Sequence, residues 1–253
     1  MHPILYIPIL LFGLIIGSFL NVCIYRIPKE EDIVKVNSHC MSCGHQLQWY
    51  DLFPVFSYVF LKGKCRYCGA SISIQYPIVE VVNGLAYCLI FFVKGLSLNS
   101  VLYCFLSSAL LVLSVIDYRT LEIPFGINVV IMCLSCVHLL LNGQKWLELT
   151  LGFFAVSVLL EIIYIVTKGA GIGGGDIKLM AVAGLMLGWK LAYIAFFLGC
   201  ILGSVIHLLR MKFSGESNVL AMGPYLSAGI FITLLIGEPL INWYVGLLAM
   251  YSA

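Results

Sequence analysis

Eight apolar segments alternate with short polar connections along the chain. They cover approximately residues 4–24, 77–93, 99–116, 124–141, 147–167, 177–188, 191–209 and 224–250. Apolar runs near twenty residues are typical of helices that cross a bilayer. The sixth run is shorter and reaches only about 18 Å, against a hydrocarbon core of about 30 Å. The pattern predicts an all-α polytopic membrane protein with about eight transmembrane helices.

Composition agrees with this pattern. The chain of 253 residues is 62% hydrophobic and 10% charged, and its mean hydropathy is +1.05. A soluble domain of this length cannot bury so much apolar surface, so we expect the lipid bilayer as a partner. The net charge of +2 gives no indication of a nucleic-acid partner. The first segment lacks a basic region before it and a small-x-small cleavage site, so we expect a retained helix.

Lysines and arginines are distributed unequally between the two sides that eight spans define. Eleven fall on one side: Arg26, Lys29, Lys35, Lys62, Lys64, Arg66, Arg119, Lys168, Lys178, Arg210 and Lys212. The other side has three: Lys94, Lys145 and Lys190. Cytoplasmic loops carry the excess of positive charge, so the first side is predicted to be cytoplasmic and both termini to lie outside.

One connection, residues 25–76, is long, and it divides the chain into a first helix (1–24), this cytoplasmic loop (25–76) and a helix bundle (77–253). The loop contains "CMSC" (Cys40, Cys43) and "CRYC" (Cys65, Cys68). Two such pairs can place four thiolates around one structural Zn²⁺. Two disulfides are the alternative, which a cytoplasmic location disfavours. His39 and His45 are alternative ligands.

The other six cysteines lie in apolar segments: Cys23, Cys88, Cys104, Cys133, Cys136 and Cys200. Cys133 and Cys136 also have C-x-x-C spacing. Within an apolar helix, however, small packing residues are the expected role of such cysteines.

Four of the twelve acidic residues lie in or at the ends of apolar segments: Glu80, Asp117, Glu161 and Asp176. A carboxylate in hydrocarbon is costly, so each is expected to have a functional or structural reason. Asp117 and Asp176 both fall near the cytoplasmic face in the eight-span topology. Two carboxyl groups that share a site hold one proton between them and can hydrolyse an amide by acid–base chemistry. The alternative is separate interfacial acids paired with Arg119 or Lys178.

Three glycines, Gly173 to Gly175, stand directly before Asp176. Without a Cβ they allow another backbone to approach closely, so a substrate chain can lie beside the acid. "GAGIGG" (169–174) also satisfies G-x-G-x-x-G. It follows an apolar helix rather than a strand, which disfavours phosphate binding.

These motifs together resemble the type IV prepilin peptidases, and the resemblance covers nearly the whole chain. "GSFLNVCIYRIP" (17–28) is similar to the N-terminal signature, and residues 43–80 resemble the tetracysteine loop. "DYRTLEIP" (117–124) and "GGGDIKL" (173–179) resemble the two catalytic aspartate motifs. "MGPYLSAG" (222–229) is similar to the last signature, with Met222 where Phe is common.

The resemblance implies a bifunctional enzyme of the bacterial cytoplasmic (inner) membrane, in pilus assembly, protein secretion or DNA uptake. Asp117 and Asp176 are the implied aspartyl protease pair, which cleaves the leader of a prepilin or pseudopilin on the cytoplasmic side. The new N-terminal residue is then methylated by S-adenosylmethionine, a reaction assigned to the loop, where Gly63 and Lys64 match positions associated with methyl transfer. For Glu80 two roles remain open: it neutralises a basic loop residue, or it helps to bind the amine. For Glu161 we expect pairing inside the helix bundle.

Two other classes of protein remain alternatives. A transporter would use Asp117 and Asp176 to relay protons or ions, but it leaves the four cysteines of the loop without a role. A membrane scaffold would use the zinc loop to bind a partner, but it gives no reason for acids beside glycines inside the membrane.

Overall fold

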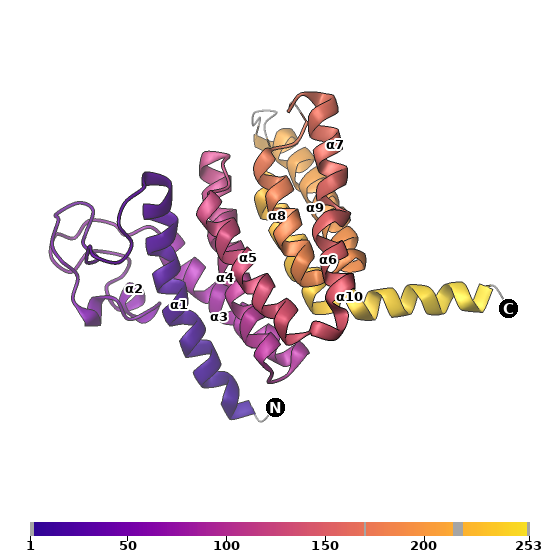
Figure 1. The fold of residues 1–253 in the computed structure, drawn as a ribbon. Helices are drawn as coiled ribbons and strands as arrows, with labels where there is room; N and C mark the ends of the chain where they lie inside the picture. Colours follow the sequence, from indigo (N-terminus) through magenta and orange to yellow (C-terminus); the bar gives the residue numbers. More distant parts are fainter. Residues whose placement is uncertain (1–2, 170, 215–219, 252–253) are drawn as a thin grey trace. The chain divides into compact units, whose positions relative to one another are not determined.

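A computed structural model describes residues 3–169, 171–214 and 220–251 (Figure 1). Every predicted apolar segment is helical within these ranges, which confirms the all-α fold. The long helices are α1 (Tyr6–Arg26), α3 (Gln75–Lys94), α4 (Leu98–Thr120), α5 (Phe125–Leu141), α6 (Trp146–Ala155), α7 (Ser157–Thr167), α8 (Gly174–Leu187), α9 (Trp189–Ser214) and α10 (Gly223–Tyr251). The fifth predicted segment corresponds to α6 and α7 together.

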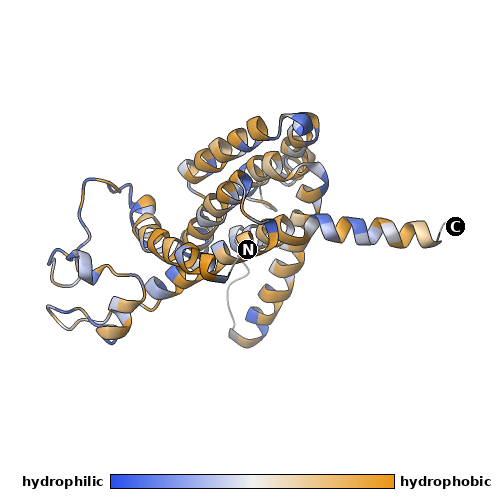
Figure 2. Cartoon of the chain, turned by 90° about the horizontal axis from the view of Figure 1, so that it is seen from below, coloured by the Kyte–Doolittle hydropathy of each residue, from blue (hydrophilic) through white to orange (hydrophobic). Residues whose placement is uncertain are grey.

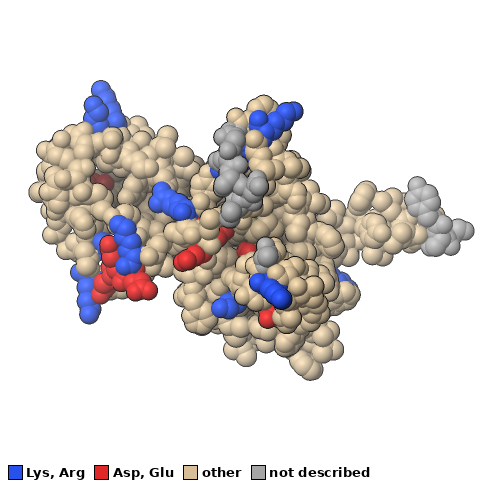
Figure 3. All heavy atoms as spheres, turned by 90° about the horizontal axis from the view of Figure 1, so that it is seen from above, with Lys and Arg blue, Asp and Glu red and all other residues tan. Residues whose placement is uncertain are grey.

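Six stretches of the described chain are helical, long and apolar enough to cross a membrane: Pro3–Lys29, Gln75–Lys94, Leu98–Thr120, Gly143–Thr167, Trp189–Phe213 and Gly223–Met250. Helix α5 is shorter but apolar. Figure 2 shows hydrophobic residues along most of the helices, whereas hydrophilic residues lie mainly in the connections and near helix ends. Charged side chains are correspondingly sparse on the face drawn in Figure 3. The protein is therefore a multi-pass membrane protein.

The fold divides into two compact units, residues 1–112 and 113–253. The first unit is built on close packing of α1 against α3. A methyl group on Gly13 would lie 2.7 Å from the Cα of Gly84, and one on Gly17 would lie 2.6 Å from the Cα of Glu80. Small residues at such contacts let two membrane helices approach until their backbones touch. The boundary predicted at residue 76 remains a prediction.

A buried polar network adds to this packing. The Asn83 side-chain amide on α3 donates to the Gly13 carbonyl on α1 at 2.8 Å. Its oxygen accepts from the Ser108 hydroxyl on α4 at 2.8 Å, and that hydroxyl also bonds to the Tyr87 hydroxyl at 2.9 Å. Polar groups inside a bilayer need such partners, and the network therefore fixes the register of three helices.

The loop between α1 and α3 contains short helical turns and α2 (Phe56–Phe60). Arg26, at the end of α1, is only 6% exposed. Its guanidinium donates to the carbonyls of Asp32, Val36 and Asn37 at 3.0, 2.8 and 3.4 Å. These carbonyls have no helical partner, so Arg26 satisfies them and ties the start of the loop to the membrane helix.

Helix α8 is the centre of the second unit. Its residues Leu179–Leu187 are all buried, and it packs against α5, α6, α7, α9 and α10. Gly152 of α6 and Gly184 of α8 lie so close that neither position has room for a Cβ. Because protein covers Leu179–Leu187, this part of the 14-residue helix does not need to span the bilayer in contact with lipid.

Glu161 lies at an exposed position of α7. The expected pairing of Glu161 inside the bundle is therefore wrong. An apolar run identifies a helix, but it does not determine which of its faces contacts the neighbouring helices.

Candidate functional site

Asp117 lies near the end of α4 and is only 5% exposed. Its Oδ2 accepts a hydrogen bond of 2.8 Å from the backbone N–H of Gly223, the first residue of α10. This N–H is one of the donors that a helix leaves unpaired at its N-terminus. A methyl group on Gly223 would lie 2.7 Å from the same oxygen, so only glycine fits beside the carboxylate.

Asp176 is the third residue of α8 and is half-buried. Its Oδ2 lies 3.1 Å from where a Cβ on Gly173 would be, so the side chain folds back over the start of the helix. A methyl group on Gly175 would lie 2.8 Å from the Cβ of Ile123. Glycine at this position therefore lets α8 begin directly against the connection that follows Asp117.

The two aspartates come together in consequence. Asp117 and Asp176 are near enough for the charge of one carboxyl group to act on the other. The Lys178 ammonium lies 5.7 Å from the centroid of the Phe125 ring. Arg210 of α9 donates to the Tyr118 hydroxyl, next to Asp117, at 2.9 Å.

The four loop cysteines also converge. The sulfur atoms of Cys40, Cys43, Cys65 and Cys68 all lie within 4.8 Å of one another. The Cys40 and Cys68 sulfurs are 3.8 Å apart. A Zn–S bond of about 2.3 Å gives a sulfur–sulfur separation of about 3.8 Å across a tetrahedron, so the geometry fits zinc. A disulfide needs about 2.05 Å, and all ten cysteines are free.

The two cysteine pairs have the same backbone conformation. In each pair the glycine after the second cysteine donates its N–H to the carbonyl of the first cysteine: Gly44 to Cys40 at 2.8 Å and Gly69 to Cys65 at 2.9 Å. Both glycines have positive φ, +69° and +72°, as expected for a tight turn around a metal. Backbone N–H groups of Cys43 and Ser42 lower the pKa of Cys40 to about 6, which favours the thiolate that binds a metal.

The alternative ligands lie elsewhere. His45 stacks against Tyr67, with ring centroids 3.6 Å apart, and His39 contacts the Asn37 carbonyl. Cys133 and Cys136 are both exposed on α5. Among the described residues, the one cluster of metal-ligating side chains contains only the four loop cysteines.

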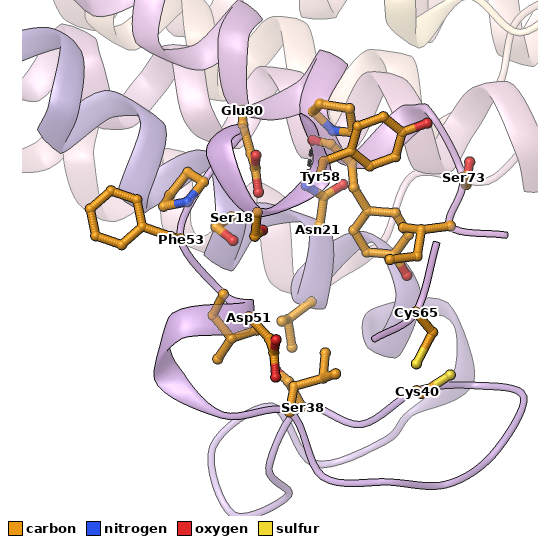
Figure 4. A pocket seen from close by; sticks show the side chains of 18 of the residues that line it. Ser18, Asn21, Ser38, Cys40, Asp51, Phe53, Tyr58, Cys65, Ser73 and Glu80 are labelled. Carbon is orange, nitrogen blue, oxygen red and sulfur yellow. Dashed lines mark hydrogen bonds between the residues drawn. The ribbon is translucent and has the colours of Figure 1, made fainter. Parts of the chain in front are cut away.

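A cavity of about 840 Å³ lies between the loop, α1 and α3, within the first unit (Figure 4). Its walls are largely apolar and aromatic, and Glu80, Asn21 and Asp51 are among its polar groups. Gly63 and Lys64 do not line it. Gly63 has a φ of +69°, and a methyl group there would lie 3.0 Å from the Tyr58 hydroxyl, which belongs to the cavity wall. Lys64 is exposed.

Three functional contacts could not be predicted from the sequence. Gly223 lies in the "MGPYLSAG" motif, which by itself gives no indication that its N–H binds Asp117. Gly175 positions the start of α8. Val55 donates its N–H to the Glu80 carboxylate at 2.7 Å. A glycine directly before a proline in "MGPY" was the only local signal for the first of these.

The fold and the site thus define a multi-pass membrane protein with an aspartate pair in one unit and a four-thiol cluster in the other. Residues 11–94 match the Bacterial Peptidase A24 N-terminal domain, and residues 104–208 match the Type IV leader peptidase family. The chain belongs to this family of aspartic proteases.

Curated relatives carry the name prepilin leader peptidase/N-methyltransferase. The Bacillus subtilis relative is 32% identical over 93% of this chain and 96% of its own length. The Pseudomonas putida relative is 28% identical over 94% and 93%, and the Pseudomonas aeruginosa relative is 27% identical over 96% and 95%. No solved structure matches the chain.

Proposed function

We propose that this protein cleaves the leader peptide of type IV prepilins or pseudopilins and then methylates the new N-terminal residue. The proposal is supported by the electrostatic proximity of Asp117 and Asp176, which are 59 residues apart along the chain, in a family whose relatives are named for both activities. Asp117 and Asp176 are the proposed catalytic pair.

Cleavage by this pair requires one ionised and one protonated carboxyl group. The ionised carboxylate takes a proton from water, whose oxygen attacks the scissile carbonyl while the protonated carboxyl donates to the carbonyl oxygen. The carbon–nitrogen bond then breaks, and the departing amine takes a proton. No side chain becomes covalently attached to the substrate. The glycines before Asp176 leave room for an extended peptide beside the pair.

The same proposal places the enzyme in the cytoplasmic membrane, with the aspartates near the cytoplasmic face and both termini outside. The asymmetry of lysine and arginine supports this orientation. A pilin leader on the cytoplasmic side, followed by an apolar helix in the bilayer, then presents its scissile bond at the depth of the aspartates.

Methyl transfer is assigned to the first unit. The four thiols fit a structural Zn²⁺, which would join the two cysteine pairs and hold the loop in shape. S-adenosylmethionine, when bound, supplies an electrophilic methyl group on a sulfonium. The cavity of about 840 Å³ lies within the range of small-molecule sites, and its aromatic walls fit this donor. Gly63 acts through Tyr58, and Lys64 lies on the surface beside it.

Intact-mass analysis of a prepilin co-expressed with the protein tests the proposal. The wild-type chain is expected to yield pilin that has lost its leader and gained one methyl group. A chain with both Asp117→Asn and Asp176→Asn is expected to yield full-length prepilin. Full-length prepilin from the wild-type chain would contradict the peptidase assignment, and cleaved but unmethylated pilin would contradict only the second activity.

A further inference from the structure

Glu80 is a buried carboxylate that the cleavage reaction does not use. It projects from α3 into the cavity of the first unit, towards Ser18 (Figure 4), and is only 6% exposed. Its Oε2 accepts the Val55 N–H at 2.7 Å, and the Ser18 hydroxyl is within hydrogen-bond reach. Both donors are neutral, so the negative charge is hydrogen-bonded but not compensated by either of them.

The other charged groups that line the cavity are engaged elsewhere or face water. Asp51 pairs with Arg66 at 2.7 Å and also accepts from the Tyr67 hydroxyl at 3.1 Å. Arg26 donates to three loop carbonyls. Glu31 is exposed. A buried charge is normally paired, and these contacts leave Glu80 as the carboxylate in this cavity that is best suited to a cationic ligand.

Two further features, one in the cavity wall and one next to it, support a ligand site. Asn21 of α1 lines the cavity, is 3% exposed and donates to the Gly17 and Tyr76 carbonyls, while its Oδ1 is a buried acceptor with no partner among the described residues. Val55, held by Glu80, has φ +60° and ψ −50°, which is an unusual conformation for a β-branched residue. Backbone strain of this kind is concentrated at binding and catalytic sites.

We propose that this cavity receives the free α-amine of the cleaved pilin, and that Glu80 binds the ammonium group and accepts its proton before methyl transfer. The inference rests on the proposed function and assigns one residue within its second step. Asn21 Oδ1 lies on the same wall as a second acceptor for the N–H groups of the amine.

The reaction balances with one methyl donor. An α-ammonium group, whose ordinary pKa is about 7.7–8.0, loses one proton to the Glu80 carboxylate. The nitrogen lone pair then forms the N–CH₃ bond as the carbon–sulfur bond of the sulfonium breaks. The sulfur keeps that electron pair and becomes a neutral thioether, and the product leaves as a methylammonium ion. Glu80 releases its proton to water before the next turnover.

The remaining walls of the cavity suit the methyl donor. Trp49, Phe53 and Tyr58 line it, and aromatic faces stack on a planar base and attract a sulfonium cation. The cavity therefore combines aromatic surface for the donor with a buried carboxylate for the amine.

Three variants of the full-length protein test this assignment. Glu80→Gln retains an acceptor for the Val55 N–H but removes the charge, whereas Glu80→Ala removes both. Glu30→Gln makes the same chemical change at an exposed carboxylate of the first unit that does not line the cavity. Each is measured for methylation of a pre-cleaved pilin peptide, for the affinity of that peptide and its N-acetylated form, and for the affinity of S-adenosylhomocysteine.

Glu80→Gln is expected to slow methylation at pH 7 by about a hundredfold. It is also expected to lower the binding affinity for the free-amine peptide by at least about tenfold. It should leave the affinities of the acetylated peptide and of S-adenosylhomocysteine unchanged. The methylation defect should shrink above about pH 8, where the amine deprotonates without a base. Glu30→Gln should behave as wild type.

Three results would overturn the inference. In the first, Glu80→Gln methylates at the wild-type rate and only Glu80→Ala loses methylation. This result would mean that Glu80 has only the structural role of accepting the Val55 N–H. The second is an equal loss of S-adenosylhomocysteine affinity in Glu80→Gln, which would place the carboxylate at the donor or in the fold. The third is a defect that does not change with pH. A wild-type chain that cleaves but never methylates would instead overturn the methyltransferase function, and this inference with it.

Discussion

Both units of the described chain contain a buried carboxylate that accepts a hydrogen bond from the backbone N–H of a distant segment. In the first unit, Glu80 on α3 accepts from Val55 at 2.7 Å. In the second, Asp117 on α4 accepts from Gly223 at 2.8 Å. The two acids are 6% and 5% exposed. A single geometric device, a backbone donor aimed at a buried carboxylate, therefore occurs twice in one chain.

The surroundings of the two carboxylates differ, and this difference separates their chemistry. Asp117 has a second carboxyl group, Asp176, within electrostatic range. Such a pair can hold and move one proton, as amide hydrolysis requires. Glu80 faces a cavity with aromatic walls instead. A buried carboxylate whose hydrogen-bond donors are neutral is suited to a cation. The neighbours of a buried acid, rather than its burial, indicate its role.

The donors differ as well. Gly223 can donate only because it lacks a Cβ, and its helix keeps the N–H fixed at Asp117. Val55 donates from a loop in a conformation that is unfavourable for its side chain. We therefore expect the aspartate site to be rigid and the Glu80 site to depend on the shape of the loop.

Removing either member of the aspartate pair is the most direct test of the comparison. Asp117→Asn and Asp176→Asn are each expected to reduce leader cleavage by at least about 10³-fold, because the reaction needs both carboxyl groups. Both variants should still methylate a pilin peptide supplied already cleaved. Cleavage is measured by mass spectrometry of purified enzyme with prepilin. Near-normal turnover in one variant would remove that residue from the pair.

Removing the metal ligands should affect the first unit instead. The double variant Cys40→Ser and Cys43→Ser is expected to lose its single zinc ion and, with it, methylation, because binding of a structural zinc is worth about 10–16 kcal/mol. Zinc is measured by elemental analysis of the purified protein. The matched control, Cys133→Ser with Cys136→Ser, changes two exposed thiols of α5 and should keep the metal. Full zinc retention in the first variant would place the metal elsewhere.

Much of this organisation is encoded locally and could be predicted. Eight apolar runs gave the helices because hydropathy and length suffice to define a span. The pairs Cys40–Cys43 and Cys65–Cys68 indicated a cluster because C-x-x-C and a following glycine fix a turn that aims two sulfurs at one point. The short length of the sixth segment set it apart from the other spans, but the burial of Leu179–Leu187 by neighbouring helices could be seen only in the structure.

Contacts between distant segments could not be predicted. Gly223 lies 106 residues from the aspartate that it holds, and Val55 lies 25 residues from Glu80. Neither spacing corresponds to a helical or turn period. The position of Glu161 could not be predicted either. Helix α7 is apolar on most sides, so its sequence does not determine which face contacts other helices.

Displacing Asp117 without changing its charge should have a smaller effect than removing it. In Gly223→Ala the new methyl group would lie 2.7 Å from Asp117 Oδ2, so the carboxylate must move. A shift of this size is expected to slow cleavage by about a hundredfold. Gly126→Ala is the control, because Gly126 is exposed in the same unit and has open space around it. Equal rates for the two variants would show that the contact with Gly223 does not position the catalytic pair.

A corresponding change can be made beside the cavity of the first unit. Gly63→Ala introduces a methyl group 3.0 Å from the Tyr58 hydroxyl at a φ of +69°. We expect methylation to fall about tenfold, because Tyr58 is displaced and the loop is strained by about 1–2 kcal/mol. Gly95 also has a positive φ, +71°, but a methyl group there would have no neighbour within 4 Å. Gly95→Ala controls for strain alone and should retain methylation. Equal methylation in the two variants would exclude an effect through Tyr58.

Lys64→Ala is expected to have the smallest effect. Lys64 is exposed and does not line the cavity, so its charge acts on the site only through solvent. We expect methylation to fall by about threefold at most, more at low salt than at high salt, with cleavage unchanged. The mass of pilin produced by the variant reports both activities in one measurement. Uncleaved pilin would mean that the loop is needed for proteolysis or folding. Fully methylated pilin at every salt concentration would mean that Lys64 is only a surface charge. Of the two residues, Gly63 alone would then influence methyl transfer, through its contact with Tyr58.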